Sequence, residues 1–238
     1  AVPILLEKDT DLVALAQTGT GKTAAFGFPM IQKIDINSKK TQGLILSPTR
    51  ELCLQITNEL KQYGQFYKGL NITAIYGGAS ITDQARSVKK GSQIIVATPG
   101  RMKDMINRKL VNISEIKYSV LDEADEMLNM GFLEDVEWVL EQTPQDRQIA
   151  LFSATMPKEI KRIADKHLNN PQEIRIKSKT ATADTIRQRY WQVSNMHKLD
   201  ALTRILEVET FDAMLMFVRT KVQTVELAEK LEARGYSA

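Results

Sequence analysis

The chain has 238 residues, of which 43% are hydrophobic and 26% charged, as expected of a globular protein with a core of its own. Lys and Arg total 32 against 29 acidic residues, so a net charge of +3 neither requires nor excludes a nucleic-acid partner. The single cysteine, Cys53, excludes a disulfide framework and a multi-cysteine metal site, and no apolar run approaches the ~18 residues of a membrane span.

Short apolar runs alternate with amphipathic stretches along the chain. The apolar runs predict strands at Leu12–Leu15, Gly43–Ser47, Asn71–Tyr76, Gln93–Ala97, Tyr118–Leu121, Gln148–Phe152 and Glu173–Ile176. The stretches between them predict helices at Thr23–Lys33, Glu51–Tyr63, Thr82–Lys89, Arg101–Asn107, Leu133–Glu141 and Lys158–Leu168. This α/β alternation indicates a parallel sheet covered by helices on both faces. Right-handed crossovers bring the carboxyl ends of such strands to one edge, where we expect the ligands.

A second domain is expected after the first, which we assign to residues 1–177. Residues 178–185 are small and polar, so we interpret them as a linker. In residues 186–238 the pattern predicts strands at Gln188–Val193 and Ala213–Val218 and helices at Met196–Val208 and Lys221–Arg234. Two strands and two helices are too few to cover a sheet of this kind, so we expect an incomplete second domain and a chain that is a fragment.

The strongest motif is AQTGTGKT, which follows the first predicted strand and opens the first predicted helix. This context favours a P-loop over an ordinary glycine-rich turn. Gly19 and Gly21 let the backbone curl so that N–H groups and the helix N-terminus face phosphates. Lys22 offers its charge to the β- and γ-phosphates, and Thr23 offers a hydroxyl to Mg²⁺. We expect ATP to be bound by the eight residues of this loop: Ala16, Gln17, Thr18, Gly19, Thr20, Gly21, Lys22 and Thr23.

A pair of acids follows another predicted strand. Tyr118–Leu121 is apolar and runs directly into Asp122 and Glu123. Taken alone, such a pair is more often the solvated start of a helix. With a P-loop upstream, Asp122 is the expected Mg²⁺ ligand together with Thr23, since Mg²⁺ takes few carboxylates and keeps several waters. Glu123 is then placed to orient or deprotonate an attacking water.

These residues resemble the DEAD-box RNA helicases, whose signature is LDEAD, here Leu121–Asp125. Further motifs of that family follow in order. They are AQTGTGKT at 16–23, PTRELCLQ at 48–55 with Cys53 for the usual Ala, GG at 77–78, TPGR at 98–101, SAT at 153–155 and MFVRT at 216–220. The resemblance covers the whole chain, and LDEADEMLNMGF looks most like bacterial members of the cold-shock and ribosome-assembly type.

The resemblance implies RecA-like domains and an ATP hydrolase that locally unwinds RNA. Lys22, Asp122 and Glu123 would act on the nucleotide, while Ser153 and Thr155 would couple hydrolysis to strand separation through Asp125. A further set would contact the RNA sugar–phosphate backbone without reading its sequence. This set is Pro48, Thr49, Arg50, Gly77, Gly78, Thr98, Pro99, Gly100 and Arg101.

The sequence also departs from the family. The adenine-recognising Gln motif is not among these residues, and neither is an RGxD-type motif nor an HRxGRxGR-type motif with its arginine finger. We therefore expect slow hydrolysis and no unaided unwinding by this chain. Two alternatives stay open: a DNA-directed superfamily 2 ATPase, and a non-catalytic RNA clamp or scaffold. The single cysteine indicates a reducing compartment, so we expect a cytoplasmic location, and we expect a monomer without membrane contact. The resemblance adds ribosome-assembly or RNA-degradation proteins as candidate partners.

Overall fold

The computed structural model describes residues 1–7, 10–17, 19–176 and 187–237. They fall in two compact units, residues 1–181 and 182–238, each of which is treated by itself. The linker predicted at 178–185 lies outside the described residues. In the part of the chain that is described, no helix is long and apolar enough to cross a membrane.

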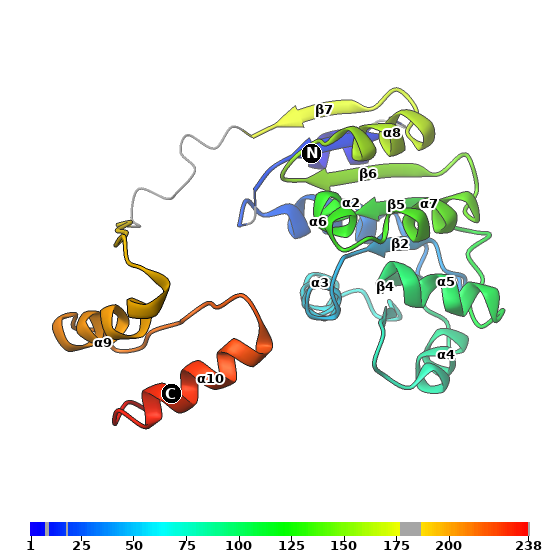
Figure 1. Ribbon diagram of the computed structural model, residues 1–238. Coiled ribbons are helices and arrows are strands. Elements are labelled where there is room, and N and C mark those ends of the chain that lie inside the picture. Colours follow the sequence, from blue (N-terminus) through cyan, green and yellow to red (C-terminus); the bar gives the residue numbers. More distant parts are fainter. Residues whose placement is uncertain (8–9, 18, 177–186, 238) are drawn as a thin grey trace. The chain divides into compact units, whose positions relative to one another are not determined.

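Unit 1 contains a parallel sheet whose strands agree closely with the predicted ones. The strands are β1 (Leu12–Leu15), β2 (Gly43–Leu46), β3 (Ile72–Ile75), β4 (Ile94–Ala97), β5 (Tyr118–Leu121), β6 (Gln148–Ser153) and β7 (Gln172–Arg175). They lie in the order β3-β4-β2-β5-β6-β1-β7, and every pair is parallel. Figure 1 shows β7, β6, β5, β2 and β4 following one another through this unit. All strands therefore end at the same edge, as predicted.

Helices cover both faces of this sheet. One face carries α1 (Val2–Glu7), α2 (Lys22–Lys33) and α3 (Arg50–Tyr63). The other carries α4 (Ile81–Lys89), α5 (Pro99–Asn107), α6 (Ala124–Asn129), α7 (Leu133–Glu141) and α8 (Lys158–His167). Strand side chains alternate between the two cores: Ile45 packs with the first group, and Leu44 and Leu46 pack with the second. Burial of both faces explains why β1 to β6 are mostly apolar, whereas the edge strand β7 is half exposed and mostly polar.

Two helices of unit 1 were not predicted. α1 was missed because it is only six residues long, too short for its apolar sequence to show a helical period. Leu5 is its one buried side chain. α6 begins directly after Glu123, within the acidic cluster that the sequence analysis treated only as a site. Neither helix alters the predicted α/β class.

Unit 2 corrects two predicted strands. It contains a 3₁₀ turn (Asn195–His197) followed by α9 (Lys198–Val208), and α10 (Lys221–Glu232). These agree with the predicted helices, but residues 188–193 and 213–218 form no strand. A strand is stabilised by hydrogen bonds to a neighbouring strand, and among residues 187–237 there is none for either segment to pair with.

Candidate active site

The strand order sorts the predicted site residues into two groups along one edge of the sheet. The neighbouring strands β5, β6 and β1 end at Asp122, Ser153 and the P-loop. The neighbouring strands β3, β4 and β2 end at the segments of residues 76–78, 98–101 and 48–50. The expected nucleotide residues and the expected RNA residues therefore occupy adjoining halves of the same edge.

The P-loop joins β1 to α2 in a conformation that depends on glycine. Gly19 and Gly21 have φ values of 80° and 79°, in the left-handed region that side chains disfavour. Thr20 Oγ1 donates to the carbonyl oxygen of Gln17 at 2.8 Å, which closes the turn. Gly21 caps α2 without a side-chain hydrogen bond from any described residue, so the first N–H groups of α2 can take an anion. Thr18 lies outside the described residues.

Lys22 and Asp122 form the centre of the nucleotide half. Lys22 Nζ lies 3.9 Å from Asp122 Oδ1, and both side chains are nearly enclosed. Burial raises the pKa of Asp122 to about 6; Lys22 opposes this shift, and the neighbouring Glu123 adds to it. A buried carboxylate with one distant cationic partner is a site that a metal cation would stabilise.

The donor set fits Mg²⁺. Asp122 is the acid at the end of β5, and Thr23 follows Lys22 in the first turn of α2. No group of three or more His, Cys, Asp or Glu side chains within metal-binding reach exists among the residues described. A cation held by Asp122 and Thr23 would therefore complete its coordination with water and phosphate oxygens, as Mg²⁺ does.

Glu123 has an unusual backbone conformation. Its φ of 52° and ψ of 53° are left-handed, which is uncommon for a residue other than glycine. Its N–H donates to Asp122 Oδ1 at 3.1 Å, and Glu123 caps α6. The sharp turn between β5 and α6 thus holds two carboxylates in sequence at the strand end. Backbone strain of this kind clusters at functional sites.

Asp125 connects the end of β5 to the end of β6. Its Oδ2 accepts hydrogen bonds from the N–H of Thr155 at 2.9 Å and from Thr155 Oγ1 at 2.8 Å. Its own N–H donates to Ser153 Oγ at 3.1 Å. Burial raises the pKa of Asp125, but hydrogen bonds from Thr155, Ser153 and the backbone of Ala154 outweigh it and leave that pKa below its usual value.

Ser153 also reaches the P-loop. The N–H of Ala16 donates to the carbonyl oxygen of Ser153 at 2.9 Å, and the Ser153 side chain is fully buried. Ser153 therefore bonds the P-loop through its backbone and Asp125 through its hydroxyl. The link to Asp125 was predicted from the motifs, but the link to Ala16 depends on β6 lying beside β1.

In the other half, Arg50 and Tyr76 bring two strand ends together. Thr49 caps α3, with its Oγ1 accepting from the N–H of Leu52 at 3.2 Å, and exposed Arg50 begins the helix. The Arg50 guanidinium lies over the Tyr76 ring, 5.1 Å from its centroid, in a cation–π arrangement. Gly78 follows with a φ of 80°, whereas Gly77 has no positive φ. Buried Pro48 precedes Thr49 at the end of β2.

The third segment of this half begins at Thr98. Its N–H donates to the carbonyl oxygen of Ile75 at 2.9 Å, and Pro99 and Gly100 open α5. Arg101 Nη1 donates to the Ala79 carbonyl oxygen at 3.0 Å and to Gln84 Oε1 at 3.2 Å. Tyr76 and Gln84 were not predicted as site residues, because neither belongs to a motif and both act through contacts between separate segments.

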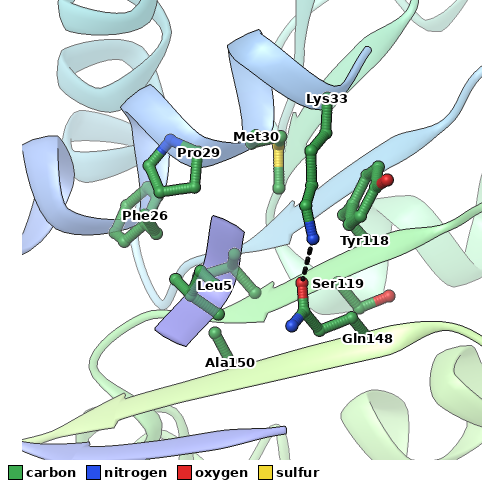
Figure 2. A pocket seen from close by; sticks show the side chains of 10 residues that line it. Leu5, Phe26, Pro29, Met30, Lys33, Tyr118, Ser119, Gln148 and Ala150 are labelled. Carbon is green, nitrogen blue, oxygen red and sulfur yellow. Dashed lines mark hydrogen bonds between the residues drawn. The ribbon is translucent and has the colours of Figure 1, made fainter. Parts of the chain in front are cut away.

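A small cavity lies away from this edge. Figure 2 shows it between α1, α2 and the sheet, with Phe26 and Pro29 on one side and Tyr118 and Gln148 on the other. Its volume of about 20 Å³ has room for one water molecule. Tyr118 and Gln148 are the first residues of β5 and β6, so the cavity lies toward the opposite ends of the strands and is no candidate for the ligand site.

The fold and the site together define a class. A P-loop between β1 and α2, an acidic pair at the end of β5, and this sheet order are those of a RecA-like P-loop domain. Residues 1–163 match the DEAD/DEAH box helicase family, and the chain belongs to that family.

Relatives of known name agree with this membership. The chain is 53% identical over 237 residues to an ATP-dependent RNA helicase DeaD of Mycobacterium tuberculosis, covering 100% of this chain and 42% of that protein. It is 47% identical to an ATP-dependent RNA helicase DeaD of Escherichia coli strain K12, covering 100% of this chain and 38% of that protein. The crystal structure of a DEAD box protein from Methanococcus jannaschii superposes with a TM-score of 0.72 at 41% identity, covering 99% of this chain and 62% of the other. The chain thus spans about two fifths of the length of these curated relatives.

Proposed function

We propose that this chain is the ATP-binding core of an RNA-dependent ATPase that locally unwinds or remodels RNA duplexes. The observation that carries the proposal is the sharing of one sheet edge by the P-loop with Asp122 and by the segments at Thr49, Gly78 and Thr98. The names of the relatives support both ATP and RNA as ligands.

The nucleotide half offers a role for each residue. The N–H groups of the P-loop and the first turn of α2 would bind the phosphates. The ammonium group of Lys22, which faces Asp122 in the ligand-free chain, would then contact the γ-phosphate. Asp122 and Thr23 would hold Mg²⁺, which supplies charge neutralisation on the phosphates when bound. Glu123, fixed beside Asp122 by its left-handed backbone, would orient the attacking water.

Ser153, Thr155 and Asp125 would transmit the state of the nucleotide. Ser153 is hydrogen-bonded to Ala16 of the P-loop and to Asp125 after β5. A movement of either partner would therefore displace Ser153. The double bond of Thr155 to Asp125 Oδ2 extends this connection to the loop after β6. The proposed result is that ATP hydrolysis is coupled to strand separation.

The RNA half would bind the sugar–phosphate backbone. Arg50 offers an exposed guanidinium, and Thr98, Pro99 and Gly100 present the start of a helix. Such groups recognise phosphate and shape, so we propose sequence-independent binding with a strong dependence on salt. The 2′-hydroxyl and the A-form shape would distinguish RNA from DNA.

For the 238-residue chain alone we propose slow hydrolysis and no unwinding. Its sequence holds no HRxGRxGR-type motif, and an arginine finger is worth ~10³–10⁵ in rate in phosphoryl transfer. We further propose a cytoplasmic monomer. The likeness of LDEADEMLNMGF to bacterial members of the cold-shock and ribosome-assembly type supports partners in ribosome assembly or RNA degradation.

The test is single-turnover ATP hydrolysis with no nucleic acid, with single-stranded RNA, and with DNA of the same sequence. We expect slow hydrolysis whose rate RNA raises more than DNA does. The Glu123→Gln variant should still bind ATP but should not hydrolyse it. Equal stimulation by DNA would favour a DNA-directed ATPase. RNA binding without any ATP-dependent step would favour a clamp.

A further inference from the structure

The three proposed RNA segments emerge from separate strands, and one buried side chain joins two of them. Gln84 lies in the first turns of α4 and is only 8% exposed. Its Nε2 donates to the carbonyl oxygen of Tyr76 at 3.0 Å, at the end of β3. Its Oε1 accepts from Arg101 Nη1 at 3.2 Å, at the start of α5. The amide thus spans the gap between the GG segment and the TPGR segment.

The chemistry of this position requires a side chain that both donates and accepts a hydrogen bond, as the Gln84 amide does. The Tyr76 carbonyl can only accept a hydrogen bond, and the Arg101 guanidinium can only donate one. A side chain between them must therefore donate at one end and accept at the other, which fixes the orientation of the Gln84 amide. A carboxylate would face the Tyr76 carbonyl with a second acceptor, and an apolar side chain would leave two polar groups unsatisfied.

Gln84 and Arg101 also act together on the loop between β3 and α4, where Gln84 bonds the carbonyl of Tyr76 at its start. Arg101 Nη1 donates to the Ala79 carbonyl oxygen at 3.0 Å as well as to Gln84, so the loop is held from both of its ends. In the described part of the chain these bonds engage Nη1 alone, and the hydrogens on Nε and Nη2 remain for a phosphate. Gln84 therefore orients the guanidinium that would contact RNA.

The effect extends to the third segment through Tyr76. The Tyr76 ring lies beneath the Arg50 guanidinium at 5.1 Å, and the carbonyl of the same residue is held by Gln84. The position of the ring beneath Arg50 depends on the backbone that carries it. The three segments at the ends of β2, β3 and β4 are thus connected through Tyr76, Gln84 and Arg101.

We propose that Gln84 is a positioning residue for RNA binding, which sets the spacing of Arg50, Gly78 and Arg101 before RNA arrives. This inference rests on the proposed RNA-binding function. Preorganised donors lose less free energy on binding than mobile ones, so loss of the Gln84 amide should weaken RNA binding and leave ATP binding unchanged.

The experiment compares Gln84→Met, which keeps the volume and removes both hydrogen bonds, with Gln62→Met at an exposed position of α3. The equilibrium Kd of a labelled single-stranded RNA is measured with a non-hydrolysable ATP analogue, and the Kd of the analogue is measured separately. We expect Gln84→Met to weaken RNA binding on the order of tenfold, with less than a twofold change in nucleotide affinity. Gln62→Met should change neither.

A double-mutant cycle with Arg101→Ala separates positioning from general stability. If Gln84 acts through Arg101, Gln84→Met should cost much less RNA affinity in the Arg101→Ala background than in the wild type. Where Gln84→Met does not fold, as judged by thermal unfolding, Gln84→Glu differs by one atom and is expected to weaken RNA binding as well.

Three results overturn the inference in distinguishable ways. Folded Gln84 variants that bind RNA like the wild type, while Arg50→Ala and Arg101→Ala bind weakly, contradict the role of Gln84 and leave the RNA function standing. Fully additive effects in the cycle contradict action through Arg101. A wild-type chain that binds ATP and no RNA overturns both the inference and the proposed function.

Discussion

Lys22 Nζ lies 3.9 Å from Asp122 Oδ1, so the P-loop cation and the predicted metal ligand face each other without a tight hydrogen bond. Burial dominates the pKa of Asp122, which rises to about 6 despite Lys22. The pair is therefore incompletely compensated in the protein alone. Mg²⁺ and phosphate would complete it, and this is the physical basis for expecting tight coupling between cation and nucleotide.

The raised pKa of Asp122 predicts how cation binding depends on pH. Mg²⁺ requires the ionised carboxylate, and a group with a pKa near 6 is roughly one-tenth ionised at about pH 5. The Mg²⁺-dependent part of ATP affinity should thus fall about tenfold between about pH 7 and 5. Titration calorimetry over this range measures it, with Asp122→Asn as the control that keeps the titration of ATP itself and lacks only the contribution of Asp122. An Mg²⁺ affinity that stays flat across this range in the wild type would refute the ligand assignment.

The raised pKa of Asp122 also affects the stability of the ligand-free chain. Because the folded pKa of Asp122 lies above its unfolded value of 3.8, Asp122 makes its full contribution to the free energy of unfolding below pH 3.8. This contribution is lost as the pH rises through about 6. The loss is on the order of 3 kcal/mol. Burial also raises the pKa of Asp11, so Asp11 likewise lowers stability as the pH rises. The pKa of Asp125 is lowered, so Asp125 adds stability as the pH rises. Only the difference between wild type and Asp122→Asn in unfolding free energy, measured from about pH 4 to 7, isolates Asp122. Parallel curves for the two proteins would contradict the assignment.

Ser153 and Ser47 offer a matched pair of buried serines. Both are fully buried near the carboxyl ends of strands, but Ser153 Oγ accepts from the N–H of Asp125, and Ser47 Oγ has no partner among the described residues. Ser153→Ala leaves the Asp125 N–H without its partner and should cost about 1–3 kcal/mol, whereas Ser47→Ala should be near neutral. Urea unfolding of both variants measures this. Equal losses would mean that the Ser153 bond carries no special weight.

Alanine substitutions at Gly77 and Gly78 distinguish the cost of backbone strain from the cost of steric crowding. A Cβ at Gly77 would meet nothing within 4 Å, and one at Gly78 only Arg50 Nη1 at 3.9 Å, but Gly78 alone has a positive φ. Gly78→Ala should therefore cost about 1–2 kcal/mol, and Gly77→Ala much less. Thermal unfolding of the two variants checks the difference. A larger cost at Gly77 would show that the turn is held differently.

The sequence predicts most of unit 1 because its strands are apolar on both faces and its helices are amphipathic. Glu51 was predicted to open its helix, and the helix begins one residue earlier, at Arg50, because Thr49 supplies the cap. α6 was not predicted because the acidic residues at its start were interpreted as site residues and not as the first turn of a helix. The segments at 188–193 and 213–218 have strand-like sequences, but a strand needs a partner that sequence does not supply.

The site was predicted in its motifs and missed in its connections. Motif order along the chain cannot tell that β6 lies between β5 and β1, which is why the bond from Ala16 to the Ser153 carbonyl was not foreseen. Tyr76 and Gln84 carry no motif, and their roles follow from contacts made across strand ends. Local patterns report local structure, whereas these contacts depend on sheet order.

Binding of Mg-ATP by the 238-residue chain and its Lys22→Ala variant tests the central claim most directly. Lys22→Ala removes a charge-assisted contact to phosphate and leaves Asp122 buried without its cation, so we predict a loss in affinity of about 10–100-fold. Lys61→Ala, at an exposed position of α3, should bind as the wild type does. Calorimetry that shows equal Mg-ATP affinity for wild type and Lys22→Ala, or no binding by a folded wild-type chain, would contradict a nucleotide site at the end of β1.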